Sequence, residues 1–197
     1  MYNSFHARFQ LKNVTLHPGE YKVTNEQIII STVLGSCVSV ALYDPLNRQG
    51  GMNHFLLPGA DHISVDDLFL LKNETRYGLY AMEILINNLI KLGSAKKNLK
   101  AKVFGGSNMF YTRDRESSIG SMNSEFALKF LQYEGIPVLS SDTGGHFGRK
   151  ILYFPQEGRI LLKKLESSRE IKHISKDERK FDDSLIKKKG SEDIILF

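Results

Sequence analysis

The sequence has little of several features that commonly decide the class of a protein. Cys37 is the only cysteine among its 197 residues, which excludes an internal disulfide, a zinc site built on paired cysteines and a cysteine-bound iron–sulfur cluster. Such sparse cysteine usage is typical of the reducing cytosol. The longest uncharged stretch, residues 27–43, falls short of the about 20 apolar residues that a membrane-spanning helix needs. We therefore expect a cytoplasmic protein without membrane insertion.

Two further patterns are missing. The N-terminal residues have no apolar core between a basic start and a small-residue cleavage site, so we expect no secretory signal and no export. The net charge is moderate, +5 at pH 7, and an excess of this size can attract an anionic partner. However, the basic run at residues 187–189 lies among acidic residues and lacks interleaved aromatic side chains. We expect a solvated surface there and no nucleic-acid partner.

The remaining composition, 41% hydrophobic and 25% charged, is that of a globular domain with one core. Alternating or β-branched runs between turns predict strands at residues 18–24, 27–34, 38–44, 53–57, 99–104, 136–141, 151–154 and 159–164. Apolar residues three and four apart predict a helix over residues 75–92, and a second helix that begins near Ser121 or Asn123 and ends at Gly135. The run at 38–44 is apolar on both faces, as in a central strand. The predicted class is α/β, with more strands than helices.

The composition changes after Leu165. From there to the end, charged residues of both signs are dense and apolar residues are sparse, which is typical of a segment that buries little surface. We expect a folded domain over residues 1–165 and a flexible or loosely docked tail over residues 166–197. The terminal string DIILF is apolar again, and it is either an edge strand, the favoured interpretation, or a docking peptide.

Cys37 is the strongest candidate for chemistry. A cysteine nucleophile needs a base to take its proton and donors to hold the oxyanion that forms when it attacks a carbonyl. His54 lies beyond the predicted strand 38–44, and a hairpin-like reversal of the chain would bring it to Cys37. Gly35 and Ser36 permit a sharp turn that can direct backbone N–H groups at a carbonyl oxygen. The alternative is that Cys37 and His54 only pack in the core, which is the commoner role of a lone cysteine.

Other candidate sites are weaker. The glycine turns at 105–107 and 143–145, the second within a glycine-rich loop predicted for 142–150, lack the lysine of a phosphate-binding loop and the GxGxxG frame, so we interpret them as tight turns. His54, His62 and His146 do not fall into the spacings of metal ligands, and no cysteine pair supports them. We expect neither a metal nor a cofactor.

Five strings occur in an order that one protein family shares: TVLGSCVSVALYDP at 32–45, GGMNHFLLP at 50–58, RYGLYAME at 76–83, KVFGGSNMF at 102–110 and DTGGHFGRK at 142–150. Because of them, the chain resembles the chemoreceptor glutamine deamidases of the CheD family over residues 15–165. The resemblance implies a compact α/β fold (α+β-like) of layered β-sheets flanked by helices, similar to the catalytic domain of the cytotoxic necrotizing factor toxins.

The resemblance also implies site residues. The nucleophile of the family falls on Cys37 and its catalytic histidine on His54. The third member, a threonine six residues before the cysteine in the usual pattern, falls on Ser31, and Thr32 lies one position later. We take Ser31 as the third catalytic residue, with Thr32 as the alternative, because a serine hydroxyl, or a backbone carbonyl at the same place, can accept from the imidazole N–H and orient the ring.

The implied reaction is hydrolysis of glutamine side chains in the cytoplasmic helices of chemoreceptors through a cysteine thioester, without a cofactor. Receptor methyl-ester hydrolysis, binding of the phosphatase CheC and a location at cytoplasmic receptor arrays are further implications. The alternatives are a regulatory partner of CheC with little catalysis, and a cysteine peptidase that shares the thioester. The intact Cys37 and His54 favour the deamidase.

Overall fold

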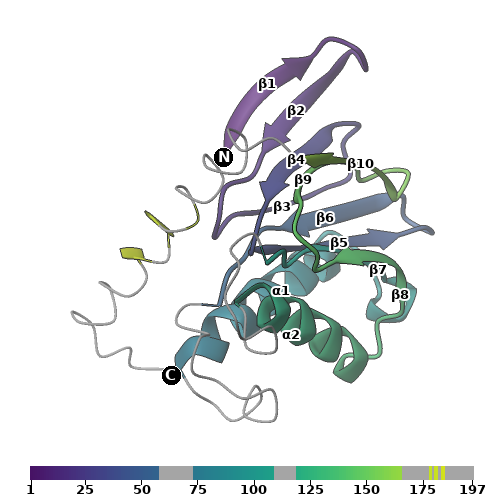
Figure 1. Ribbon diagram of the computed structural model, residues 1–197. Helices are drawn as coiled ribbons and strands as arrows, with labels where there is room; N and C mark the ends of the chain where they lie inside the picture. The colour runs from purple at the N-terminus through teal and green to yellow at the C-terminus, as the bar shows by residue number, and fades with distance from the viewer. Residues whose placement is uncertain (58–72, 109–118, 166–177, 179, 182, 185–197) are drawn as a thin grey trace.

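Two mixed five-stranded β-sheets and two α-helices make up the computed structural model (Figure 1), which describes residues 1–57, 73–108, 119–165, 178, 180, 181, 183 and 184. The first sheet has the strand order β1 (Tyr2–His6), β2 (Leu11–Thr15), β4 (Ile29–Leu34), β9 (Gly148–Phe154) and β10 (Arg159–Leu165). The second has the order β3 (Tyr21–Thr24), β6 (Gln49–Asn53), β5 (Val38–Asp44), β7 (Lys100–Gly105) and β8 (Val138–Thr143).

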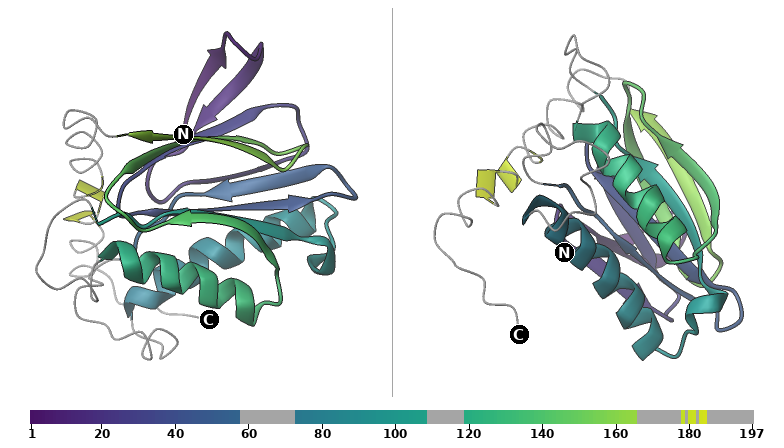
Figure 2. Two further views of the ribbon diagram at one scale, coloured as in Figure 1. Left: turned by 45° about the vertical axis from the view of Figure 1, so that its right-hand side comes forward. Right: turned by 90° about the horizontal axis from the view of Figure 1, so that it is seen from below.

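The helices are α1 (Asn73–Lys91) and α2 (Ile119–Tyr133), and a short 3-10 helix, η3 (Lys96–Asn98), precedes β7. Both α-helices lie on the face of the second sheet that is turned away from the first sheet, so the molecule has three layers (Figure 2). The α/β layered fold expected from the sequence is therefore confirmed. No helix among the described residues is long and apolar enough to cross a membrane.

Strand directions follow from the connections. β5 pairs antiparallel with both β6 and β7, while β7 and β8, joined through α2, pair in parallel. In the first sheet β4 is parallel to β2 and antiparallel to β9. The tight reversal between β5 and β6 returns the chain to the start of β5.

Two hydrophobic cores fill the spaces between the layers. One lies between the helices and the second sheet, and the other lies between the two sheets. Side chains alternate along β5, so Val38 and Val40 belong to the helix-side core whereas Ala41 belongs to the inter-sheet core, as does Cys37, the residue before β5. The prediction that 38–44 is a central strand, buried on both faces, is confirmed.

The prediction of a strand at 53–57 is wrong. The strand is β6, which ends at Asn53, and residues 54–57 contribute only an isolated bridge. Two glycines hide β6 in the sequence, because glycine weakens a strand pattern. They are there because a Cβ at Gly50 would collide with the hydroxyl of Tyr153, and a Cβ at Gly51 would lie 2.7 Å from Val23.

Other expectations differ in detail. The sequence does not predict β1 and β2, since neither strand has an alternating apolar face, although Val14 of β2 is buried in the inter-sheet core. α2 begins at Ile119, before the expected start. Residues 142–150 are not one loop, because β8 extends to Thr143 and β9 begins at Gly148. The terminal DIILF lies outside the described residues.

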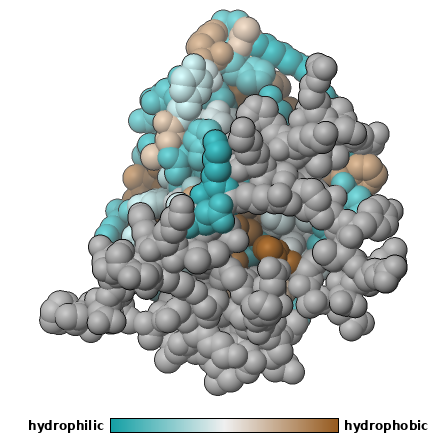
Figure 3. All heavy atoms as spheres, turned by 60° about the vertical axis from the view of Figure 1, so that its left-hand side comes forward, coloured by the Kyte–Doolittle hydropathy of each residue, from teal (hydrophilic) through white to brown (hydrophobic). Residues whose placement is uncertain are grey.

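Figure 3 shows one face of the molecule, where hydrophilic residues dominate the upper part and an apolar area is visible near the centre.

Candidate active site

Cys37 lies where the chain crosses from one sheet to the other. β4 ends at Leu34 in the first sheet, and β5 begins at Val38 in the second. Residues 35–37 make this crossing, and the Cys37 side chain is fully buried in the inter-sheet core. The loop therefore holds the thiol between the two layers, at the junction of two predicted strands where the sequence places Cys37.

His54 reaches Cys37 by the reversal of the chain through β5 and β6. It follows Asn53, the last residue of β6, and the next residue, Phe55, exchanges two backbone hydrogen bonds of 2.9 Å with Val38. The Cys37 sulfur, a ring nitrogen of His54 and a carboxylate oxygen of Glu178 lie within 4.8 Å of one another, and all three residues are buried. The expected juxtaposition of Cys37 and His54 is present in the structure.

A threonine on β4 holds the imidazole. Thr32 Oγ1 lies 2.7 Å from His54 Nδ1 and donates to the carbonyl oxygen of Leu16 at 3.0 Å. A hydroxyl has one hydrogen, and the Leu16 carbonyl can only accept it, so Nδ1 must carry a proton and donate to Thr32. This tautomer is assigned from the hydrogen-bond network. It leaves a lone pair on Nε2, which has no hydrogen-bond partner among the described residues.

The side chain of Ser31 does not face His54. Its hydroxyl lies 3.0 Å from Thr15 Oγ1 on the neighbouring strand β2. Adjacent residues of a strand point to opposite faces, so only one of Ser31 and Thr32 can face His54, and in this structure it is Thr32. Of the two hydroxyls that the sequence offers, that of Thr32 is therefore the one that contacts the imidazole.

Burial sets the charge of the imidazole. It lowers the pKa of His54 from 6.5 to about 4, although the nearby carboxylate of Glu178 raises it. The ring is therefore neutral at pH 7. A neutral imidazole is the form that can accept a proton from a thiol.

The crossing loop presents its amides in one direction because its carbonyls are all engaged on the other side. The carbonyl oxygen of Gly35 accepts from Ser107 N at 2.7 Å, that of Ser36 from Asn123 Nδ2 at 2.9 Å, and that of Cys37 from Gly106 N at 2.8 Å. A side chain at Gly105, whose φ is +109°, would collide with the Cys37 carbonyl. The N–H groups of residues 35–37 are left to form a concave set of donors, an anion-binding nest.

A carboxylate fills this nest. Glu178 Oε1 accepts from the N–H groups of Gly35 at 2.8 Å and Cys37 at 3.1 Å, and Oε2 accepts from Ser36 N at 2.9 Å and Ser36 Oγ at 2.7 Å. Glu178 is only 6% exposed. Burial of a charged carboxylate is unfavourable unless hydrogen bonds replace its water, and here four donors do so.

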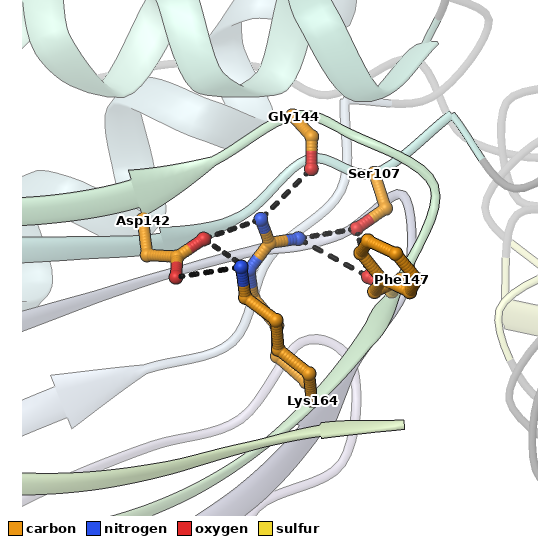
Figure 4. Close-up of polar contacts among 6 residues, drawn as sticks. Ser107, Asp142, Gly144, Phe147 and Lys164 are labelled. Atoms are coloured by element: carbon orange, nitrogen blue, oxygen red, sulfur yellow. Dashed lines mark hydrogen bonds and ion pairs between the residues drawn. The ribbon is translucent and has the colours of Figure 1, made fainter. Parts of the chain in front are cut away.

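Residues of the two glycine motifs hold the crossing loop, residues 35–37, in place. Buried Arg149 donates to the carboxylate of Asp142 and the carbonyl of Gly144, and also to the hydroxyl of Ser107, whose backbone N–H holds Gly35 (Figure 4). Lys164 adds a longer ion pair with Asp142, 3.8 Å between nitrogen and oxygen. Gly105 is the last residue of β7 and Thr143 the last of β8, and Gly105, Gly106, Gly144 and Gly145 all have positive φ. Their role is to fix the position of the crossing loop.

Two residues of the site were not predicted. Asn123 was expected only as a possible start of the second helix, yet it is fully buried and its Oδ1 also accepts from Leu57 N at 2.8 Å. An amide on the apolar face of a helix is the feature that could have drawn attention to it. Glu178 lies in a charged segment where nothing distinguishes it from its neighbours.

Cysteine, histidine and carboxylate are ligand types that a metal such as zinc takes. Here, however, each oxygen of Glu178 already accepts two hydrogen bonds from residues 35–37, so the arrangement around it is that of an anion held by amides. His146 lies away from this group, with its ring nitrogen 3.0 Å from the carbonyl of Asn108, and His62 lies outside the described residues.

Comparisons with known proteins identify the family of the chain. Residues 56–164 match the family described as CheD chemotactic sensory transduction. The "Probable chemoreceptor glutamine deamidase CheD 1" of Shewanella oneidensis is 43% identical over 166 residues, 84% of this chain and 79% of that protein. The "Probable chemoreceptor glutamine deamidase CheD" of Hahella chejuensis is 41% identical over 191 residues, 97% of this chain and 86% of that protein.

A protein of the same name from Agrobacterium fabrum is 44% identical over 169 residues, 85% of this chain and 88% of that protein. Among solved structures, the Bacillus licheniformis hypothetical protein YfiH aligns with a TM-score of 0.41 and 13% identity, over 64% of this chain and 51% of that one. The extent and identity of the sequence matches place the chain in the CheD family.

Proposed function

We propose that this protein is a chemoreceptor glutamine deamidase, in which Cys37 attacks the side-chain amide of a receptor glutamine. The observation that carries the proposal is the buried Cys37–His54 pair beside a preformed set of backbone donors. Relatives that are 41–44% identical to this chain over the aligned residues carry the deamidase name. The reaction consumes water and releases ammonia and a glutamate side chain.

The residues divide the chemistry between them. Nε2 of His54 accepts the proton of the Cys37 thiol as sulfur bonds to the carboxamide carbon. His54 then gives this proton to the departing nitrogen, the C–N bond breaks, and a thioester remains. Water, deprotonated by the same imidazole, attacks the thioester and releases the sulfur. Thr32, in place of Ser31, is the positioning residue that keeps Nε2 available for both transfers.

The nest of residues 35–37 is the proposed oxyanion site. The carboxamide oxygen becomes negative in each tetrahedral intermediate, and backbone N–H groups already aimed at that position stabilise the charge without rearrangement. Removing one such donor from a comparable site costs about 100- to 1,000-fold in turnover. The engaged carbonyls of Gly35, Ser36 and Cys37 keep the donors in place between turnovers.

The family resemblance supports further parts of the proposal. They are a deamidase unit over residues 1–165 with the fold of the cytotoxic necrotizing factor catalytic domain, action at cytoplasmic chemoreceptor arrays, hydrolysis of receptor methyl esters, and binding of the phosphatase CheC. Methyl esters suit the same acyl chemistry, with methanol as the leaving group. Titration of purified CheC into the protein, followed by calorimetry, tests the last of these.

Mass spectrometry of a receptor cytoplasmic fragment tests the proposal. We expect incubation with the protein to replace the side-chain NH2 of particular glutamines by OH while the fragment stays intact. Cys37→Ala should abolish this conversion and keep the thermal unfolding profile, since alanine fills most of the same space. A cleaved fragment would indicate a peptidase, and equal conversion by Cys37→Ala would refute the cysteine mechanism.

A further inference from the structure

The position of Glu178 is not explained by the proposed reaction. Its carboxylate does not orient His54, because Thr32 holds that ring. Both oxygens of Glu178 accept hydrogen bonds from donors of residues 35–37. Those donors are the ones that the reaction needs for the oxyanion. A substrate glutamine and the side chain of Glu178 therefore compete for the same atoms.

Glu178 has the chemistry of the reaction product. Deamidation turns glutamine into glutamate in the place where the carboxamide was bound, and Glu178 is a glutamate side chain within 4.8 Å of both Cys37 and His54. Three backbone N–H groups and one hydroxyl face it. A carboxylate accepts from all of them, whereas one end of a carboxamide is an NH2 group that meets the N–H of Ser36 donor to donor.

A second contact anchors the same segment. Phe181 packs against the inter-sheet core, and its ring centroid lies 6.0 Å from that of Tyr77 on α1. Gly19 lies under both rings: a Cβ there would be 2.6 Å from Phe181 and 2.6 Å from the Tyr77 hydroxyl. The N–H of Gly19 bonds to the carbonyl of His54. The aromatic contact thus lies beside the catalytic histidine, and it binds the segment independently of the carboxylate.

We propose that residues 35–37 form a carboxylate-binding subsite for the product glutamate and that Glu178 occupies it as an internal product mimic, so that the C-terminal segment inhibits the enzyme competitively. This rests on the proposed function for the identity of the product. Being tethered, Glu178 acts at a high effective concentration and needs only modest affinity to fill the site. A receptor segment that displaces it gains access to Cys37.

Kinetics of the full-length protein test the inhibition. We compare Glu178→Ala and Phe181→Ala with Asp183→Ala, which removes an exposed carboxylate from the same segment. Where the docked form outnumbers the open form by about ten to one, Glu178→Ala should raise kcat/KM for a receptor glutamine peptide about tenfold and leave kcat unchanged. Phe181→Ala should act in the same direction, and Asp183→Ala should match the wild type. A fall in kcat for Glu178→Ala would instead assign Glu178 a part in the reaction and overturn the inference.

Glu178→Gln gives a test that needs no receptor. If residue 178 lies where product lies, the glutamine becomes a substrate in the same chain. The Cys37 thiol proton passes through His54 to the leaving ammonia, a thioester forms at residue 178, and water converts it to glutamate. Peptide mapping should find glutamate at position 178 in the single variant and glutamine in the Cys37→Ala, Glu178→Gln double variant. Unconverted glutamine in an enzyme that deamidates receptor peptides would overturn the docking.

Alkylation of Cys37 by iodoacetamide separates the two proposals. Glu178→Ala should react several-fold faster than wild type, and Asp183→Ala at the wild-type rate. Faster alkylation without conversion of any receptor glutamine would support the docked carboxylate and refute the deamidase. Equal alkylation rates and equal kcat/KM in an active enzyme would refute the docked carboxylate alone.

Discussion

Replacing Thr32 by valine isolates the role of one hydroxyl, because valine has nearly the same shape. The hydroxyl donates to the Leu16 carbonyl and accepts from His54 Nδ1. Valine leaves both groups buried without this partner, and an unsatisfied buried polar group costs about 1–3 kcal/mol. With two such groups, we expect the free energy of unfolding to fall by about 2–6 kcal/mol.

The effect on turnover is separable from the effect on stability. The hydrogen bond from Nδ1 favours the tautomer with a free Nε2 by about 1–1.5 kcal/mol, which is about a tenfold bias. Loss of ring orientation adds to it, so kcat/KM should fall about 10- to 100-fold at a temperature where the variant is folded. Thr32→Ser keeps the hydroxyl and should stay within a few-fold of the wild type.

Ser31→Ala is the matched control, since it removes the neighbouring hydroxyl, which bonds only to Thr15 among the described residues. Ammonia release from a receptor peptide measures turnover, and urea titration measures stability. If Ser31→Ala lost more turnover than Thr32→Val, the assignment of the orienting residue would be wrong. Equal activity of Thr32→Val and wild type would show that the hydroxyl does not position His54.

Two other features lead to predictions. Between pH 6.5 and about 4 the unfolded chain binds a proton at His54 that the folded chain does not. Acidification from pH 7 to 4 should therefore lower the free energy of unfolding by about 3 kcal/mol. Urea titrations at both pH values should show that His54→Gln lacks this loss, and an identical pH dependence in the two proteins would contradict the prediction. Glu178, His17 and Glu20 are the titratable groups that act on the ring electrostatically. Asn123→Leu leaves the Ser36 carbonyl and Leu57 N–H without their side-chain partner, so both stability and kcat should fall, and an unchanged kcat would show that the loop holds its position without the amide.

Much of the fold follows from local sequence patterns. The apolar run 38–44 lies in the middle of the second sheet, and the spacing of apolar residues over 75–92 corresponds to α1, Asn73–Lys91. Patterns fail where packing overrides propensity. β6 contains Gly50 and Gly51 because neighbouring side chains leave no room for a Cβ, and a strand with two adjacent glycines has no pattern to recognise.

The candidate site likewise contains contacts that local patterns predict and contacts that they do not. Cys37 and His54 are separated by one hairpin, and the sequence suggests their proximity. The choice between Ser31 and Thr32 depends on which face of β4 points to the inter-sheet space, and the sequence of β4, with one serine next to one threonine, does not contain that information. Asn123 and Glu178 approach the loop from positions 87 and 142 residues away from Ser36. Such contacts are set by tertiary packing, which no local pattern encodes.

The character of the loop at residues 35–37 connects catalysis with inhibition. A neutral carboxamide offers one strong acceptor to a set of three N–H groups and a hydroxyl, whereas the tetrahedral intermediate offers a full negative charge. The loop is therefore more complementary to the intermediate than to the substrate, which is the condition for lowering a barrier. The same donors are also complementary to any carboxylate of the right reach, the product and Glu178 included. An enzyme that makes a carboxylate beside an oxyanion site must release that anion before the next turnover. A tethered glutamate binds there because the affinity of the site for negative charge, which the tetrahedral intermediate requires, extends to any carboxylate.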